Sequence, residues 1–224
     1  MGAKLCPKII LEGTRLTKKT DLAFKLNEHP KIVGPKKYRY HSPLISAEWC
    51  AFTNYPWGRG LINFNFDEEQ KAMETYATWV KLFELQKYYS WIIDRFHIST
   101  QMHQSIYNNR YYDFKWLEER LVALGFRIIF CFRKPSSFLE AREERLKISG
   151  NPKQYDNLDI FIKEQEILNQ LLDKSIIPVL HLDVTHYSID QLADNVAEYL
   201  EKSDELFCKG EILKIKVKVF NNIK

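Results

Sequence analysis

The chain has 224 residues, 45% of them apolar and 28% charged, so it can bury the core of one globular domain and is neither disordered nor fibrous. Its net charge of +4 favours anionic ligands and argues against nucleic acid as the main partner. The composition leaves the oligomeric state open, a homodimer included.

The four cysteines form neither a Cys-x-x-Cys pair nor a Cys/His zinc spacing. No apolar run approaches the length of about 18 residues that suggests a membrane span. Lys4 and Lys8 flank an apolar stretch that is too short for a signal peptide. We therefore expect a cytoplasmic protein with reduced thiols and no membrane contact.

Strand-like and helix-like segments alternate along the chain. The expected order is strand 8–12, helix 20–28, strand 31–34, irregular segment 34–65, helix 67–86, strand 88–93, helix 112–124, strand 127–132, helix 135–147, helix 157–174, strand 178–182 and helix 188–201. Apolar strands between helices predict a parallel sheet that is covered on both faces.

Two segments depart from this alternation. The irregular stretch 34–65 is rich in aromatic residues, and a segment of that length is usually a binding loop or lid; its aromatics could instead cover the edge of the core. In 213–219, apolar residues alternate with lysines, which predicts a half-exposed strand. Its lysines fit edge protection better than an anion site.

The turn after the first strand contains most of a phosphate-binding loop. Gly13, Lys19 and Thr20 fit the pattern G-x-x-x-x-G-K-S/T, whereas Lys18 replaces the second glycine. In such a turn, backbone N–H groups wrap a polyphosphate, the lysine reaches its terminal phosphates and the threonine holds Mg²⁺. Lys18 adds a Cβ beside the phosphates and also a positive charge. A chance match in a charged turn is the alternative.

A second constellation, IIDRFHISTQMHQ at 92–104, places an acid and an arginine at the carboxyl end of a buried strand. Open α/β sheets bind ligands at that edge. Asp94 could act on a substrate hydroxyl or hold Mg²⁺ through water, and Arg95 could clamp a phosphate. A surface Asp-Arg pair of little consequence is the alternative.

Together these stretches resemble the thymidylate kinase-like group of P-loop nucleoside and nucleotide kinases. That family carries an EG-containing loop and the motif Asp-Arg-Tyr/Phe-x-x-Ser-x-x-Ala/Tyr-x-Gln, from which Met102 departs. The matching positions are Asp94, Arg95, Phe96, Ser99 and Gln104. FRIIFCFRKPSSFLEAREERL is similar to the strand and lid helix of these kinases, and VLHLDVTHYSIDQLADNVAEYL to their last strand, adenine-side loop and final helix.

The resemblance implies a P-loop three-layer α/β/α sandwich with a mostly parallel sheet and an added C-terminal strand. Residues 1–206 would form the kinase-like domain, with a lid near 142–157, and 207–224 a strand extension. ATP and Mg²⁺ would be the cofactors. The implied ATP-binding residues are Gly13, Thr14, Lys18, Lys19, Thr20 and Asp21.

The resemblance also implies the remaining roles. Thr20 and Asp94 would hold the metal. The implied catalytic residues are Lys19, Asp94, Arg95, Arg142 and Arg145, and the implied substrate-binding residues are Arg39, Phe96, Ser99 and Gln104. Independently of the family, Arg142 and Arg145 lie three apart on an expected helix and can share one face, where they would stabilise a phosphoryl transition state or only pair with nearby glutamates.

Three departures from the family bear on the acceptor. The acid usual inside the loop is replaced by Arg15 and Leu16, the Arg-Glu-Pro motif after the second strand is absent, and the long helix lacks its usual arginine. We therefore expect ATP-dependent phosphoryl transfer to a nucleotide or nucleoside, with a pyrimidine favoured. The alternative is a catalytically weak or inactive nucleotide-binding protein that retains the fold.

Overall fold

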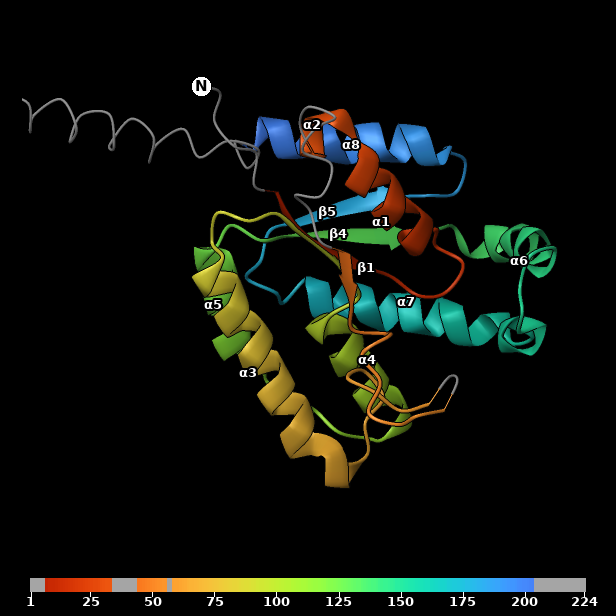
Figure 1. Ribbon diagram of the computed structural model, residues 1–224. Helices are drawn as coiled ribbons and strands as arrows, with labels where there is room; N and C mark the ends of the chain where they lie inside the picture. Colours follow the sequence, from red (N-terminus) through yellow and green to blue (C-terminus); the bar gives the residue numbers. More distant parts are fainter. Residues whose placement is uncertain (1–6, 34–43, 56–57, 204–224) are drawn as a thin grey trace, which may run out of the picture.

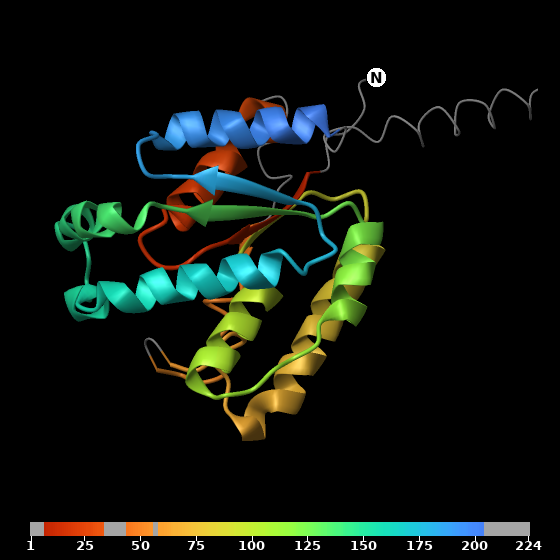
Figure 2. The same ribbon diagram turned by 180° about the vertical axis from the view of Figure 1, so that it is seen from behind.

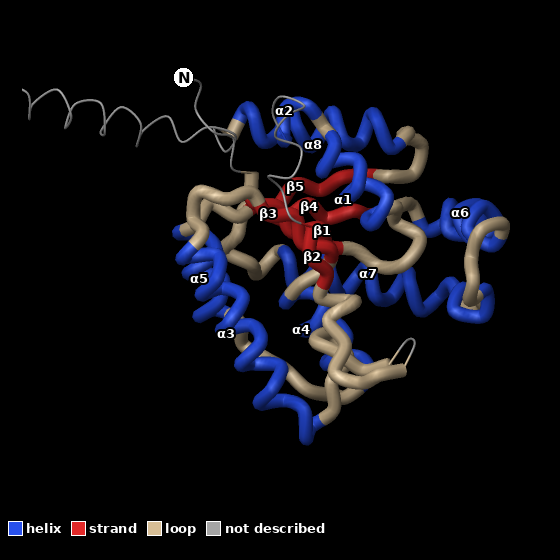
Figure 3. The backbone as a smooth tube through the Cα atoms, in the orientation of Figure 1, coloured by secondary structure: helices blue, strands red, loops and turns tan. Residues whose placement is uncertain are grey.

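A five-stranded parallel sheet forms the centre of the protein, as the computed structural model shows (Figures 1 and 3). The structure describes residues 7–33, 44–55 and 58–203. The strands, in spatial order, are β2 (Leu44–Ser46), β3 (Trp91–Asp94), β1 (Lys8–Glu12), β4 (Arg127–Phe132) and β5 (Val179–Asp183). Because β1 lies in the middle, the loop that follows it is flanked by the loops that follow β3 and β4.

Helices cover both faces of the sheet, which makes the three layers expected from the sequence (Figures 1 and 2). One layer contains α1 (Lys19–Glu28), α2 (Pro30–Val33) and α8 (Ile189–Lys202). The other contains α3 (Glu69–Leu85), α4 (His97–Tyr107), α5 (Lys115–Ala123) and α7 (Leu158–Leu172). The short α6 (Phe138–Leu146) and a 3₁₀ turn (Pro152–Tyr155) project together beyond the end of the sheet.

The core divides according to the alternation of side chains along β1. Ile10 belongs to the cluster that packs against α3, α4, α5 and α7. Ile9 and Leu11 point the other way, into a cluster with Leu22 of α1 and Leu192 of α8. All five side chains are fully buried. Both faces of the strand are therefore apolar, which explains why it reads as a continuous hydrophobic run.

The expected strand at 31–34 is wrong, because residues 30–33 form the helix α2. Pro30 begins that helix, a position where proline's fixed φ is compatible with helical geometry. The backbone N–H of Lys31 donates to His29 Nδ1 at 3.2 Å, which satisfies one N–H of the first turn. The second strand is instead Leu44–Ser46, within the segment expected to be irregular.

The helix α4 had no counterpart among the expected elements, although its residues belong to the second constellation. The strand expected at 213–219, the extension 207–224 and Arg39 lie outside the described residues. Among the residues that are described, no helix is long and apolar enough to cross a bilayer.

Candidate functional site

Three strand ends meet beside the loop that follows β1. β1 leads into Gly13, β3 is followed by Arg95 and β4 by Arg133. Because the strands are parallel, these residues lie at the same edge of the sheet, and α1 begins there with its N-terminus. The site is therefore assembled at the edge where α/β sheets bind ligands.

Gly13 allows the loop to pass directly over β4. Its φ of 149° lies in a region that side chains rarely adopt, and a Cβ placed there would be 2.4 Å from the carbonyl oxygen of Cys131. Only a glycine fits this close approach of two backbones.

Lys18 occupies the position of the second glycine and adopts the left-handed conformation that a glycine would take, with φ 57° and ψ 13°. For a residue with a Cβ this conformation costs about 1–2 kcal/mol. The side-chain ammonium donates a hydrogen bond to the carbonyl oxygen of Tyr187 at 3.0 Å. The loop therefore keeps a glycine-like backbone, and its extra side chain contacts the loop that precedes α8.

Lys19 is buried and crosses the loop. Its Nζ donates to the carbonyl oxygen of Thr14 at 2.7 Å, and the hydroxyl of Thr17 donates to the same oxygen at 2.7 Å. Burial lowers the pKa of Lys19, and the positive charge of Arg95 lowers it further. A buried ammonium at the centre of a loop with this shape suits an anionic ligand.

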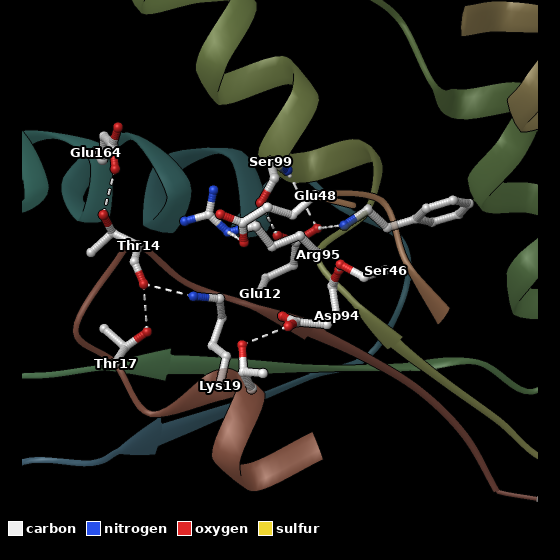
Figure 4. Close-up of polar contacts among 12 residues, drawn as sticks. Glu12, Thr14, Thr17, Lys19, Ser46, Glu48, Asp94, Arg95, Ser99 and Glu164 are labelled. Carbon is white, nitrogen blue, oxygen red and sulfur yellow. Dashed lines mark hydrogen bonds and ion pairs between the residues drawn. The ribbon is translucent and has the colours of Figure 1, made fainter. Parts of the chain in front are cut away.

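Thr20 and Asp94 join α1 to the end of β3. The threonine hydroxyl donates to Asp94 Oδ2 at 2.8 Å. Asp94 lies close to Lys19 in Figure 4. Asp94 is 2% exposed, and its buried Oδ1 has no hydrogen-bond partner among the residues that the structure describes. An orphaned carboxylate oxygen beside a hydroxyl fits Mg²⁺, which is usually held by one or two protein oxygens together with substrate phosphates and water. Among the described residues there is no cluster of three or more His, Cys, Asp or Glu residues that could hold a metal.

Arg95 is 4% exposed and has a left-handed backbone with a φ of 60°. Its Nε lies 3.5 Å from Glu48 Oε2, and within the described part of the chain neither Nε nor Nη2 has a hydrogen-bond partner. Arg95 lowers the pKa of Glu48, so that carboxyl group is ionised at neutral pH. The pair lies above Lys19 in Figure 4.

Glu12, the last residue of β1, is fully buried and organises the start of α4. One carboxylate oxygen accepts from the backbone N–H of Phe96 at 2.9 Å and of Ser99 at 3.3 Å, and the other accepts from the hydroxyl of Ser99. These contacts satisfy N–H groups that a helix N-terminus leaves free. Ser99 is thus occupied in holding α4 beside the loop.

A polar network joins the loop to α4 and α7. Glu164 accepts from the hydroxyl of Thr14 and, at 2.9 Å, from that of Tyr107. Burial raises the pKa of Tyr107 to about 12. Burial also lowers the pKa of neighbouring His103 to about 4, so its imidazole is neutral at pH 7. A carboxylate from α7 therefore lies beside this loop, in which Arg15 and Leu16 replace the acid that is usual in the kinases that the sequence resembles.

The structure does not bring Phe96 and Gln104 to the site's surface. Phe96 is fully buried and stacks on Trp79, with 5.8 Å between the ring centroids. Gln104 is also fully buried, and its Nε2 donates to the backbone carbonyls of Ile62 and Phe64 at 3.2 and 3.0 Å. Both side chains hold the surrounding helices and loop together.

The projecting α6 segment carries the two expected lid arginines. Arg142 donates to the carbonyl oxygen of Tyr155 at 2.9 Å and to Asp156 at 3.1 Å. Arg145 donates to the Tyr155 hydroxyl at 3.3 Å and also lines the cavity described below. Tyr155 packs in a small cluster with Phe138, so the segment has an apolar core of its own.

A cavity of about 320 Å³ lies between the loop, the end of β3 and the α6 segment. It is lined by Arg15, Leu16, Thr17, Lys18, Lys19, Thr20, Asp21, Glu48, Trp49, Arg95, Arg133, Ala141, Glu144, Arg145, Ile148, Gln154, Tyr155 and Ile189. The structure thus gathers most of the expected phosphate-side residues around one space.

Glu48 and Arg133 were missed by the sequence analysis. Glu48 lies just after β2, which the sequence did not reveal as a strand. Arg133 directly follows a buried strand that the sequence did predict, as Arg95 does, and this shared position could have identified Arg133 as a site residue.

The fold, with its loop after β1, is that of the thymidylate kinase-like P-loop kinases, as comparison with solved structures shows. Neither a protein-family model nor a curated protein sequence matched the chain. A crystal structure of the YorR protein of Bacillus subtilis in complex with phosphorylated GDP is similar with a TM-score of 0.62, at 16% identity, over 88% of this chain and 97% of that chain. The thymidylate kinase of Candida albicans is similar with a TM-score of 0.50, at 17% identity, over 92% and 95%. At these identities the likeness concerns the fold.

Proposed function

We propose that this protein is a kinase that uses ATP and Mg²⁺ to phosphorylate a nucleotide or nucleoside. The observation that carries the proposal is the 13–20 loop, in which Lys19 crosses the turn and Thr20 bonds to Asp94 at 2.8 Å. Similar folds in a thymidylate kinase and in a protein bound to phosphorylated GDP support a nucleotide ligand. The kinase-like domain would comprise residues 1–206, with its lid near 142–157 and an extension at 207–224.

The donor phosphates would lie on the loop. Lys19 would leave the carbonyl of Thr14 to contact their terminal oxygens, while backbone N–H groups at the start of α1 contact the others. Thr20 and Asp94 would hold Mg²⁺, which when bound neutralises charge on the phosphates.

The charges around the cavity support a polyphosphate ligand. Six lining residues are cationic and three are acidic. The cations are Arg15, Lys18, Lys19, Arg95, Arg133 and Arg145, and the acids are Asp21, Glu48 and Glu144. An excess of positive charge in a partly enclosed space attracts an anion and stabilises the charge that develops during phosphoryl transfer. Arg145 would supply part of that charge from the lid.

Glu48 favours a hydroxyl group as the phosphoryl acceptor, and hence a nucleoside. Its ionised carboxylate already pairs with Arg95, which reduces the capacity of that arginine for an acceptor phosphate. A carboxylate accepts a hydrogen bond from a hydroxyl and repels a phosphate. In the transfer, the acceptor oxygen bonds to the γ-phosphorus, its proton passes to Glu48, and the bond to the bridging oxygen breaks to release ADP. Lys19 stabilises the charge on the phosphates.

The acceptor's base would lie against Trp49, an aromatic residue of the lining that is 67% exposed. Phe96 lies in the core and Tyr155 packs with Phe138, so among the described aromatic lining residues Trp49 offers the exposed flat surface. The preference for a pyrimidine rests on the motif at 94–104.

A nucleotide-binding protein with little or no activity is the second candidate, and Lys18 is the observation that favours it. Its left-handed backbone with a Cβ places extra bulk where the pattern has glycine. The ammonium group of Lys18 adds a positive charge that favours phosphates, but its side chain still occupies space that a glycine would leave open.

Calorimetry with Mg·ATP tests the binding half of the proposal. We expect Lys19→Ala to abolish measurable binding, and Lys25→Ala, which removes the same charge from an exposed position of α1, to bind like the wild type. Equal affinity of the wild type and Lys19→Ala would place the triphosphate elsewhere.

ADP release with a panel of nucleosides and nucleoside monophosphates tests the activity half. We expect turnover with a nucleoside and a loss of about 10²–10⁴-fold in kcat for Glu48→Gln, the usual range for a general base. If Mg·ATP binds and no acceptor is turned over, the inactive binder is the correct function. If monophosphates alone react, Glu48 is not the base.

A further inference from the structure

Arg133 is held in place by its backbone and its neighbours. Its N–H donates to Gln165 Oε1 at 2.9 Å, and Gln165 Nε2 donates to its carbonyl oxygen at 2.9 Å. One amide side chain of α7 therefore continues the hydrogen bonding of β4 beyond the end of the strand. The position from which the side chain departs is fixed.

The guanidinium group of Arg133 forms no ion pair with the described residues, although Glu144, Glu140 and Asp183 act on its charge at longer range. It is 3% exposed, and its Nη1 donates to the carbonyl oxygen of Ser137 at 2.9 Å. The guanidinium carbon also lies 5.8 Å from the ring centroid of Phe138. Its Nε is buried with no hydrogen-bond partner, and no carboxylate of the described residues lies within the 4.0 Å of an ion pair. Burial lowers its pKa.

A buried guanidinium with an unused N–H is costly for a folded chain. An apolar residue would fill the same space without that cost. We therefore expect the charge of Arg133 to contribute little to the stability of the free protein. An anionic ligand in the cavity would supply the missing acceptor.

The sheet places Arg133 on the side of the loop opposite to Arg95. β3 and β4 pair with opposite edges of β1, so the two arginines flank the loop that contains Lys19. Arg95 lies on the side of Glu48, the proposed acceptor base. Arg133 lies just before the α6 segment, and Arg145 lies near the end of that helix, and both arginines line the same cavity.

On the basis of the proposed function, we propose that Arg133 is a phosphate-binding residue of the donor site, which holds the phosphate chain of ATP from the β4 side. The group that it recognises is a linear polyphosphate, because the charged wall and the loop would contact phosphate oxygens and not a nucleobase. Arg145 would then contact the phosphate chain from the lid, and Arg133 would contact it from the residues that join β4 to the lid.

Calorimetry with magnesium tripolyphosphate and with Mg·ATP tests this role. We expect Arg133→Met to weaken both affinities about tenfold or more, the size of a lost charge-assisted contact. Arg120→Met is the matched control, since Arg120 pairs with Glu84 at 2.7 Å and does not line the cavity. We expect that control to bind both ligands like the wild type.

Thermal unfolding of the ligand-free proteins separates binding from structure. Because Arg133 is buried with an unused N–H and no ion-pair partner among the described residues, we expect the Tm of Arg133→Met to equal or exceed that of the wild type. A lower Tm with unchanged affinities would give Arg133 a structural role and overturn the inference. If the methionine variant does not fold, Arg133→Gln decides, and wild-type affinity in that variant also overturns it.

The outcomes are separate from those of the proposed function. If the wild type binds tripolyphosphate but is no kinase, a loss of affinity in Arg133→Met still supports the assignment of Arg133. If the wild type is an active kinase and Arg133→Met binds Mg·ATP as tightly, the inference fails and the proposed function stands.

Discussion

Replacement of Gly13 by alanine is the sharpest test of the loop geometry. A Cβ at this position would lie 2.4 Å from the Cys131 carbonyl oxygen, 2.9 Å from Thr17 Oγ1 and 3.2 Å from Lys19 Cδ. The first of these contacts is with the backbone of β4, so relief requires a shift of the loop relative to the sheet. The alanine would also have to adopt a φ of 149°.

The two penalties set the magnitude. Backbone strain in a glycine-only region costs about 1–3 kcal/mol. Overpacking against a fixed backbone costs about 1–3 kcal/mol more. The lower entropy of the unfolded alanine chain offsets less than about 1 kcal/mol of this. For a domain of this size each kcal/mol lowers Tm by about 2–4 °C, so we expect a fall on the order of 10 °C.

Gly150→Ala is the matched control. No atom lies within 4 Å of a Cβ at that position, and its φ is not in the positive range. Its expected effect on stability is within about 0.5 kcal/mol. Thermal and urea unfolding of both variants, followed by circular dichroism, make the comparison. Equal midpoints for Gly13→Ala and Gly150→Ala would show that the close approach to β4 is not a feature of the folded protein.

Three further predictions address the site. Lys18→Gly should preserve or raise affinity for Mg·ATP in calorimetry, because glycine takes the left-handed conformation without strain; a loss at low salt that vanishes at high salt would instead reveal a contribution from the lysine's charge. Asp94→Asn should reduce kcat by at least about tenfold and reduce ATP affinity far less than that, and an unchanged kcat would remove Asp94 from the mechanism. His103 has a pKa of about 4 in the folded protein and an ordinary value near 6.5 when unfolded, so its neutral form contributes stability above pH 6.5 that is lost as pH falls toward 4. His103→Gln should reduce the loss of unfolding free energy between pH 7 and pH 4.5 by on the order of 2 kcal/mol, measured by urea unfolding against the wild type; identical slopes would contradict the assigned cause.

The sequence by itself determined the layered fold and the position of the loop that follows β1. Continuous apolar strands between amphipathic helices specify a parallel sheet, since both faces of each strand must be covered. The order of strand, Gly13, Lys19, Thr20 and helix is local, so its loop could be identified without knowledge of the rest of the chain. The short strand at 44–46 escaped because three edge residues carry too little pattern.

Only the tertiary structure decided which side chains face the cavity. Phe96 and Arg95 are neighbours in sequence, yet one ring packs in the core while the guanidinium lines the cavity, because the chain turns from β3 into α4 between them. Glu164 reaches Thr14 across 150 positions, and Arg133 lies beside the loop because β4 pairs with β1. Such contacts depend on strand order and helix packing. These bring together residues that are far apart in the sequence, and no local sequence pattern predicts that they will touch.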